Sequence, residues 1–216
     1  DGHAGRGAVF RDRPSGHVHV QVVFREEILR QPQILGRRPQ MAESGAGRVL
    51  CVRLNDPPDS RVAIDGFPRA LLGTEPKYNL GPLALAFVNP NRTSLVVAEG
   101  GEPKGADRVR VYELPDDDKT LPFDKAKLTL RVAATGKSAA GEGDFFGVAA
   151  ASTTLFAASS SDDATGWIFK CDTGGVTPVL TRFIATKRET GASAPRAIAV
   201  SNRGELVVAQ AGEFGP

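Results

Sequence analysis

The carboxylate with the most favourable setting for chemistry in this chain is Glu99, which is followed directly by Gly100-Gly101. Glycines carry no side chain, so a ligand or another part of the chain can come close to the backbone there. Glu99 is therefore our first candidate for binding a polar ligand or a cation. The alternative is that Glu99 caps a turn or forms an ion pair with nearby Arg108.

A second acidic feature is the pair Asp162-Asp163, which follows three serines. Adjacent carboxylates supply the oxygen ligands that Ca²⁺ prefers. Serine–aspartate clusters also form turns, because their side chains hydrogen-bond the local backbone. Both interpretations of the pair remain open at this point.

Histidine and cysteine provide weaker signals. His17 and His19 would share one face of a strand, but a metal site needs further ligands and none is visible nearby, so a solvated strand face is favoured. Cys51 and Cys171 match no metal or redox motif. They fall on the same type of strand in repeats that are two apart, beyond bridging distance, and we expect free, partly buried thiols.

No catalytic set is visible in the sequence. It contains no Gly-x-Ser-x-Gly, no P-loop and no dinucleotide-binding fingerprint. All 3 histidines lie within the first forty residues. A hydrolase that relies on histidine would need its base from that segment, which argues against this route.

Composition places the chain among ordinary globular proteins. Its 216 residues are 41% hydrophobic and 24% charged, and the formal net charge is only +2. This charge implies no nucleic-acid or membrane partner, and no apolar run approaches the roughly 20 residues of a membrane span. The 24 glycines and 15 prolines suit many short strands that are joined by tight turns.

An internal repeat organises the chain from Ala42 onward. Aligning Ala42, Ala98, Ala158 and Ala209 gives spacings of 56, 60 and 51 residues. Periods of this size are typical of β-propellers, in which one sheet cannot bury both of its own faces. A β-sandwich is the competing prediction, but it does not require such a repeat.

Each repeat divides into four apolar runs, and each run is predicted to be one strand. The small residues of the first run fit an inner strand near a central axis, and the polar fourth run fits an outer edge strand. The expected strands are 83–88, 146–151 and 196–200; 95–99, 155–159 and 206–210; 48–54, 108–114 and 166–171; and 61–64, 128–133 and 177–185.

The predicted fold is therefore all-β: a β-propeller fragment of about three to four blades with four antiparallel strands each. We expect an irregular segment, a linker or an aberrant stretch, over 1–40, and a partial propeller over 41–216. Within 1–40, the alternation from His17 to Phe24 predicts one strand. The expected blades are 42–70, 80–134, 145–186 and an incomplete 194–216. Since the last repeat is unfinished, we expect the chain to be a piece of a longer protein.

The run Gly81-Pro82-Leu83-Ala84-Leu85-Ala86-Phe87, followed by Leu95-Val96-Val97-Ala98-Glu99, resembles the NHL and SMP-30/gluconolactonase-like propellers. The run Pro195-Arg196-Ala197-Ile198-Ala199-Val200 with Leu206-Val207-Val208-Ala209 resembles them too. The resemblance covers 42–216. It implies a six-bladed, TolB-like intact protein and, by analogy alone, an extracytoplasmic or secreted location.

The resemblance also implies where a divalent cation would bind. Gluconolactonase-like proteins hold it through acidic and amide side chains, several of them just before the small residue of an inner strand. The matching positions here are Leu83, Phe146 and Arg196, and none can ligate calcium through oxygen. No cofactor is therefore evident, although calcium stays possible through Glu99, Asp162 or Asp163.

The resemblance places a binding surface on the loops between second and third strands and on the connections into the next inner strand. Our ligand-binding candidates there are Glu99, Asn79, Glu102, Asp144 and Arg196. Arg196 could hold an anion or pair with an acidic residue of a neighbouring blade. Further polar residues on these loops are Glu43, Asp107, Asp162, Asp163 and Glu213.

The leading functional hypothesis is a non-enzymatic repeat propeller that binds a small polar ligand or a protein through this acidic loop face. The alternative, from the resemblance, is an SMP-30-like lactone hydrolase or a quinone-dependent sugar dehydrogenase. RNA binding, as in some NHL domains, would need a basic face with exposed aromatic residues. We therefore expect no nucleic-acid partner.

Overall fold

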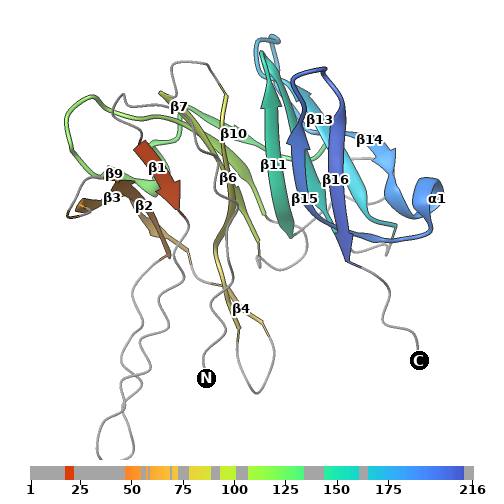
Figure 1. Ribbon diagram of the computed structural model, residues 1–216, viewed down its shortest axis with the longest axis horizontal. Helices are drawn as coiled ribbons and strands as arrows, with labels where there is room; N and C mark the ends of the chain where they lie inside the picture. The colour runs from red at the N-terminus through yellow and green to blue at the C-terminus, as the bar shows by residue number, and fades with distance from the viewer. Residues whose placement is uncertain are drawn as a thin grey trace, which may run out of the picture.

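The computed structural model describes residues 18–21, 47–54, 57, 59–68, 70–72, 78–88, 93–100, 107–133, 144–160 and 165–211. These residues are almost entirely strands and turns, with one short α-helix, so the protein is all-β. Figure 1 shows the sheets standing side by side in chain order, from the first strands to the last.

The second sheet along the chain is the most deeply buried. Its strand order is β10-β8-β7-β6, and every neighbouring pair is antiparallel. All six residues of β7 are buried, because this strand has a packed sheet on each side. The strands of this sheet are β6 (Pro82–Phe87), β7 (Ser94–Glu99), β8 (Val109–Glu113) and β10 (Leu128–Leu130).

The third sheet repeats this construction with four antiparallel strands in simple sequence order. Its strands are β11 (Phe145–Ala151), β12 (Thr154–Ser159), β13 (Trp167–Asp172) and β14 (Thr181–Ala185). The short helix α1 (Thr186–Thr190) follows it and ends at Gly191, whose φ of 81° is the left-handed conformation that glycine adopts without strain.

The remaining sheets lie at the two ends of the series. The first sheet has the order β1-β2-β3-β9, and the fourth is the hairpin β15-β16, with the hairpin β4-β5 lying apart. Their bounds are β1 (Val18–Gln21), β2 (Gly47–Arg53), β3 (Asp59–Phe67), β9 (Leu121–Pro122), β15 (Ala194–Val200), β16 (Leu206–Ala211), β4 (Ala70–Leu72) and β5 (Tyr78–Leu80).

Two hydrophobic cores lie between successive sheets, and strand alternation divides the residues of β7 between them. Leu95 and Val97 pack with Val49, Cys51 and other residues of the first sheet. Val96 and Ala98 lie in the other core, with residues of the third sheet that include Phe145, Val148 and Leu155. Successive side chains of a strand point to opposite faces, so a continuous apolar run is needed where both faces are covered.

The predicted strands of the four repeats are confirmed in the described residues, with boundaries that differ by a few residues. The strand predicted after His17 is present as β1, which pairs with β2. Cys51 and Cys171 are free, as expected, and they are buried more fully than predicted. The helix α1 lies in the connection after β14, and a 3-10 turn, η2 (Phe123–Lys125), follows β9; neither was among the predicted elements.

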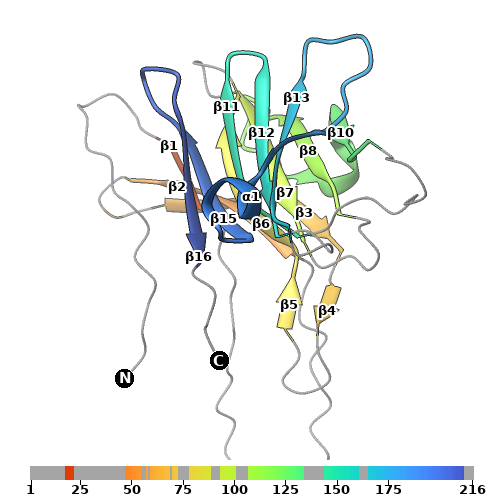
Figure 2. The same cartoon turned by 90° about the vertical axis from the view of Figure 1, so that its right-hand side faces the viewer.

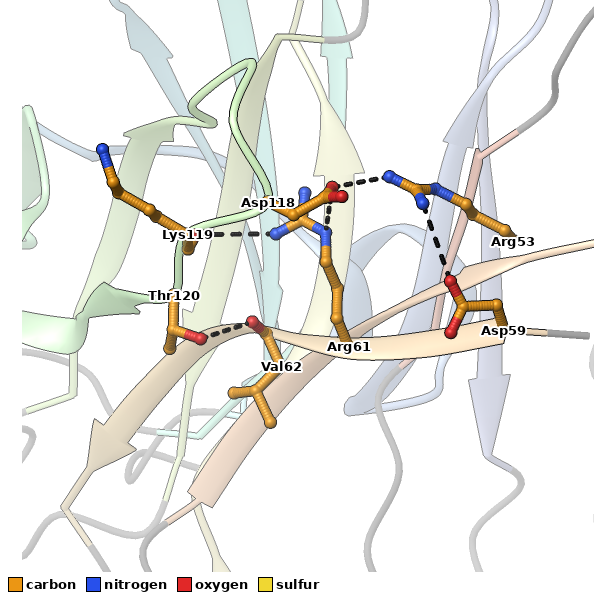
Figure 3. Close-up of polar contacts among 7 residues, drawn as sticks. All are labelled: Arg53, Asp59, Arg61, Val62, Asp118, Lys119 and Thr120. Carbon is orange, nitrogen blue, oxygen red and sulfur yellow. Dashed lines mark hydrogen bonds and ion pairs between the residues drawn. The ribbon is translucent and has the colours of Figure 1, made fainter.

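One connection ties the first two sheets together in a way that the repeat did not predict. After β8 the chain crosses to the first sheet, where β9 pairs in parallel with β3. The Asp118 carboxylate accepts a 2.6 Å hydrogen bond from Arg53 and lies 3.1 Å from Arg61 Nε, while the Thr120 hydroxyl donates to the Val62 carbonyl (Figure 3). Within the described part of the chain, no helix is long and apolar enough to cross a membrane.

Candidate functional site

The most regular feature of the predicted loop face is a β-bulge that occurs at the same place in three consecutive sheets. Pro82 pairs with Glu99 and Ala84 with Ala98, which leaves Leu83 as the extra residue. The same shift leaves Phe146 extra in β11 and Arg196 extra in β15. Bulges bend a strand and redirect one side chain, and they are frequent beside functional sites.

The three bulged residues are the positions that the resemblance matched to cation ligands. In each sheet the residue before the bulge (Pro82, Phe145 or Pro195) is buried. The inner strands β6, β11 and β15 lie next to one another (Figure 2). The bulges therefore repeat along the inner edge of the series, and we call Leu83, Phe146 and Arg196 the bulge row.

Within the bulge row, Arg196 stacks on Phe146. The guanidinium carbon lies 4.0 Å from the centroid of the Phe146 ring. Arg196 is exposed, and no carboxylate of the described residues pairs with it. Arg196 therefore stacks across two sheets, and a stacked guanidinium keeps its N–H donors available at its edges. Its pairing with an acidic residue of a neighbouring blade stays a prediction.

The side chain of Leu83 packs over Gly100, the residue after Glu99. A Cβ on Gly100 would come within 2.2 Å of Leu83 Cδ1 and 3.5 Å of Asp144 Cα. Gly100 also donates its backbone N–H to the Gly81 carbonyl over 3.0 Å. The close approach that the sequence suggested is therefore made by the protein's own chain at this glycine.

Glu99, the leading candidate, is only 6% exposed and forms an ion pair with Arg110 of β8. Arg110 also donates to the Thr129 hydroxyl and lies over the Phe123 ring. Burial raises the pKa of the Glu99 carboxyl, and the hydrogen bond from Arg110 opposes that rise. The expected partner was Arg108, but Arg108 contributes its backbone carbonyl, which accepts from the Glu99 N–H.

Asp107 and Asp144 come together next to this pair. Asp107 is 1% exposed, and its carboxylate accepts a 2.7 Å hydrogen bond from the Asp144 backbone N–H. Asp144 has a positive φ of 56°, which aspartate tolerates better than most residues. The Asp107 charge also raises the pKa of Glu99. Asp107 therefore acts as a link between β8 and the start of β11.

Of the remaining predicted residues, Asn79 lies within the described part of the chain, in β5, with Leu71 as its cross-strand partner. Within the described residues, no group of three or more His, Cys, Asp or Glu side chains is arranged to hold a metal ion. The candidates Glu43, Glu102, Asp162, Asp163 and Glu213 lie outside the described residues.

Two polar features of this face were missed by sequence reasoning. Arg110 was not singled out, although cross-strand diagonal neighbours could have been found by pairing the runs 95–99 and 108–114. Gln210, at the position equivalent to Glu99, donates to the Ala192 carbonyl and accepts from Thr190. Thus the residue at the end of the second strand anchors a neighbouring segment in both sheets.

The fold and the bulge row together define an all-β protein of consecutive, mainly antiparallel sheets, three of which share a β-bulge at the same place. No family model matches the chain, and no curated protein or solved structure matches it.

Proposed function

We propose that this protein is a non-enzymatic β-propeller-type repeat protein that binds, at its bulge row, a ligand combining an anionic group with an apolar part. The observation that carries the proposal is the exposed Arg196 stacked on Phe146 at a bulge that three sheets share. Arginine supplies a planar set of donors that matches carboxylate and phosphate groups.

The propeller assignment is supported by how the sheets pack. The second sheet has a core on each face, which a two-layer sandwich does not give to any sheet. Inner strands contact inner strands along the series, and small residues such as Gly147 allow the close approach that a common axis requires. Each four-stranded sheet is then one blade of the propeller.

The site differs in charge from the one expected from sequence. The acidic residues Glu99 and Asp107 are buried and hydrogen-bonded, so they stabilise the loop face from within. Arg196 is the exposed charge in the bulge row. The lactone-hydrolase and sugar-dehydrogenase alternative remains a prediction, because no described contact bears on it.

Three probes test the proposal by NMR titration of the isotope-labelled protein: benzoate, inorganic phosphate and benzyl alcohol. We expect benzoate to shift the amide signals around Arg196 at lower concentration than phosphate does, and benzyl alcohol to have the smallest effect. Arg196→Gln removes the charge and should raise the dissociation constant for benzoate at least about tenfold, since a charged hydrogen bond contributes roughly 1.5–3 kcal/mol.

Arg203→Gln is the matched control. Arg203 is an exposed arginine in the turn between β15 and β16, at the opposite end of the same hairpin, where it pairs with Glu205. The Arg203→Gln variant should bind benzoate as the wild type does. Unchanged benzoate binding in Arg196→Gln, or no response to any anion, would overturn the proposed site.

A further inference from the structure

Two arginines of β8 lie on the face of the second sheet that points toward the first sheet. In β8, Val111 belongs to the core with the third sheet, and Tyr112 belongs to the core with the first sheet. Successive side chains of a strand alternate between the two faces, so Arg110 and Arg108 share the side of Tyr112. Both guanidinium groups therefore lie at the end of the sheet where Glu99 pairs with Arg110.

Strand β10 adds a third arginine beside these two. Thr129 pairs with Arg110 in the antiparallel ladder between β10 and β8. Two positions further along this ladder, Arg131 comes opposite Arg108, on the face that Thr129 and Arg110 share. Like charges directly opposite each other on neighbouring strands are destabilising. The contact between Arg108 and Arg131 is therefore repulsive in the protein alone.

The carboxylates of this face do not balance the three arginines. Glu99 is engaged by Arg110. Among the described residues, neither Arg108 nor Arg131 forms an ion pair with a carboxylate. Arg108 donates one N–H to the backbone carbonyl of Asp107 over 2.7 Å, which satisfies a donor but supplies no charge. Positive charge is thus in excess at the ends of β8 and β10.

The excess charge acts on Arg108. Burial lowers the pKa of this guanidinium, and the neighbouring charge of Arg131 lowers it further. Glu99 and Asp107 act in the opposite direction, and Arg110 adds to the repulsion. An anion between Arg108 and Arg131 would remove this repulsion and would accept hydrogen bonds from the N–H groups that have no partner.

The surroundings of the two arginines are fixed on one side and open on the other. The Arg110 side chain is only 16% exposed, and it is held by Glu99, by the Thr129 hydroxyl at 3.2 Å and by the Phe123 ring at 5.3 Å. Arg108 is partly buried, whereas Thr129 and Arg131 are exposed. A ligand can therefore reach Arg108 and Arg131 from the solvent over a rigid base.

We propose that Arg108 and Arg131, with the Thr129 hydroxyl, bind a phosphate group, either as the free ion or as a monoester. Guanidinium groups match the geometry of phosphate oxygens, and a doubly charged group neutralises both arginines where a single carboxylate would leave one charge over. This site is separate from the bulge row and does not rest on the function proposed for it. Both of its strands belong to the second sheet, which has a core on each face.

The test is an NMR titration of the isotope-labelled protein at about pH 7.5, where phosphate carries close to two charges. Inorganic phosphate, glycerol 2-phosphate and acetate are added at constant ionic strength. We expect both phosphates to shift the amide signals of residues 108–111 and 128–131, and acetate to bind at least about tenfold more weakly. Tighter binding of glycerol 2-phosphate would support a monoester as the ligand, and tighter binding of inorganic phosphate would support the free ion.

Arg131→Gln should raise the dissociation constant for phosphate at least about tenfold, because a hydrogen bond between charged groups is lost. Arg131 is exposed, so the variant should fold, and circular dichroism checks this. Arg188→Gln is the matched control: Arg188 is an exposed arginine of α1 that pairs with Glu189, and this variant should bind phosphate as the wild type does.

Melting temperatures separate a binding role of Arg131 from a structural one. Without phosphate at low ionic strength, Arg131→Gln should melt no lower than the wild type, because one of two opposed like charges is gone. With phosphate the wild type should gain more, since a ligand that binds the folded state stabilises it. A variant that melts lower than the wild type by the same amount with and without phosphate would show a structural role and overturn the proposal.

Two further results would overturn this site without affecting the bulge row. One is the absence of phosphate-dependent shifts in residues 108–111 and 128–131, whatever happens around Arg196. The other is phosphate binding that appears only in Glu102→Gln, which would mean that Glu102, outside the described residues, already neutralises the arginines. Arg196→Gln should leave the shifts of residues 128–131 unchanged, so the two sites can fail independently.

Discussion

Gly147 of β11 packs directly against the backbone of Ala197 in β15. A Cβ on Gly147 would lie 3.1 Å from the Cα of Ala197 and 3.2 Å from the carbonyl oxygen of Arg196. These are backbone atoms, which cannot rotate away as a flexible side chain can. The spacing between the third and fourth sheets is therefore set by the absence of a side chain at this glycine.

Gly147→Val is expected to lower the free energy of unfolding by about 1–3 kcal/mol, which is the usual cost of overpacking. Urea denaturation followed by tryptophan fluorescence measures it. Gly174→Ala is the control, because a Cβ there would make only ordinary contacts of 3.5 Å or more, and it should change stability by less than about 0.5 kcal/mol. Equal stabilities for the wild type and Gly147→Val would contradict the close packing of β11 on β15.

The buried pair Glu99–Arg110 leads to a second prediction. Arg110→Met leaves the carboxylate buried without its cation, and removing one member of a buried pair costs about 3–5 kcal/mol. The double variant Glu99→Leu/Arg110→Met should recover most of that loss, because no charge then remains to be solvated. Thermal and urea denaturation of the single and double variants check this. Arg188→Met is the control, since Arg188 pairs with Glu189 on the surface and should be nearly neutral.

The stability of the Arg110→Met variant has a defined pH dependence. A carboxyl whose pKa is raised in the folded state holds its proton more tightly there, so its favourable contribution is present below its ordinary value of 4.5 and is lost as the pH rises through the folded pKa. Arg110→Met removes the hydrogen bond that limits the rise in the pKa of Glu99. Its deficit relative to the wild type should therefore shrink as the pH falls toward 4.5, and a deficit that grows on acidification would be inconsistent with a buried Glu99.

Glu113 should show the opposite behaviour. Hydrogen bonds from the Ser94 hydroxyl and, less strongly, from Lys127 lower the pKa of this carboxyl. A lowered pKa means stabilisation that is present above the ordinary value of 4.5 and is lost as the pH falls through the folded pKa. Glu113→Gln should therefore lose less stability than the wild type on acidification below pH 4.5. The difference should stay below about 1 kcal/mol, because the side chain is partly exposed.

Much of the fold could be predicted from the sequence because the repeat makes each strand appear several times. The apolar run 95–99 was predicted to be a strand, and it forms most of β7, which is buried throughout. Two contacts could not be predicted: the hydrogen bond from Arg53 to the Asp118 carboxylate and the parallel pairing of β9 with β3. Both connect two repeats through a polar segment that has no alternation of apolar and polar residues.

The site was harder to predict for a different reason. A bulge changes the face of every later residue, but it falls within the first three residues of each strand (at Leu83, Phe146 and Arg196), where too few residues precede it for a change in the alternation to be seen. The burial of Glu99 was likewise hidden. Its neighbour Gly100 suggested an open loop, whereas the glycine makes room for Leu83.

Tyr112 carries the last prediction. It is fully buried, and its hydroxyl donates a 2.6 Å hydrogen bond to the Phe123 carbonyl. Burial raises the pKa of this phenol, so stability should be lost as the pH rises through about 10, where an unfolded tyrosine ionises. The chain has 2 tyrosines, and Tyr78→Phe isolates the Tyr112 signal. Its phenolate absorbance should appear only together with the loss of the β-sheet circular dichroism signal, whereas titration in a folded protein would contradict the buried hydrogen bond. Tyr112→Phe should cost about 1 kcal/mol, because the carbonyl loses its donor.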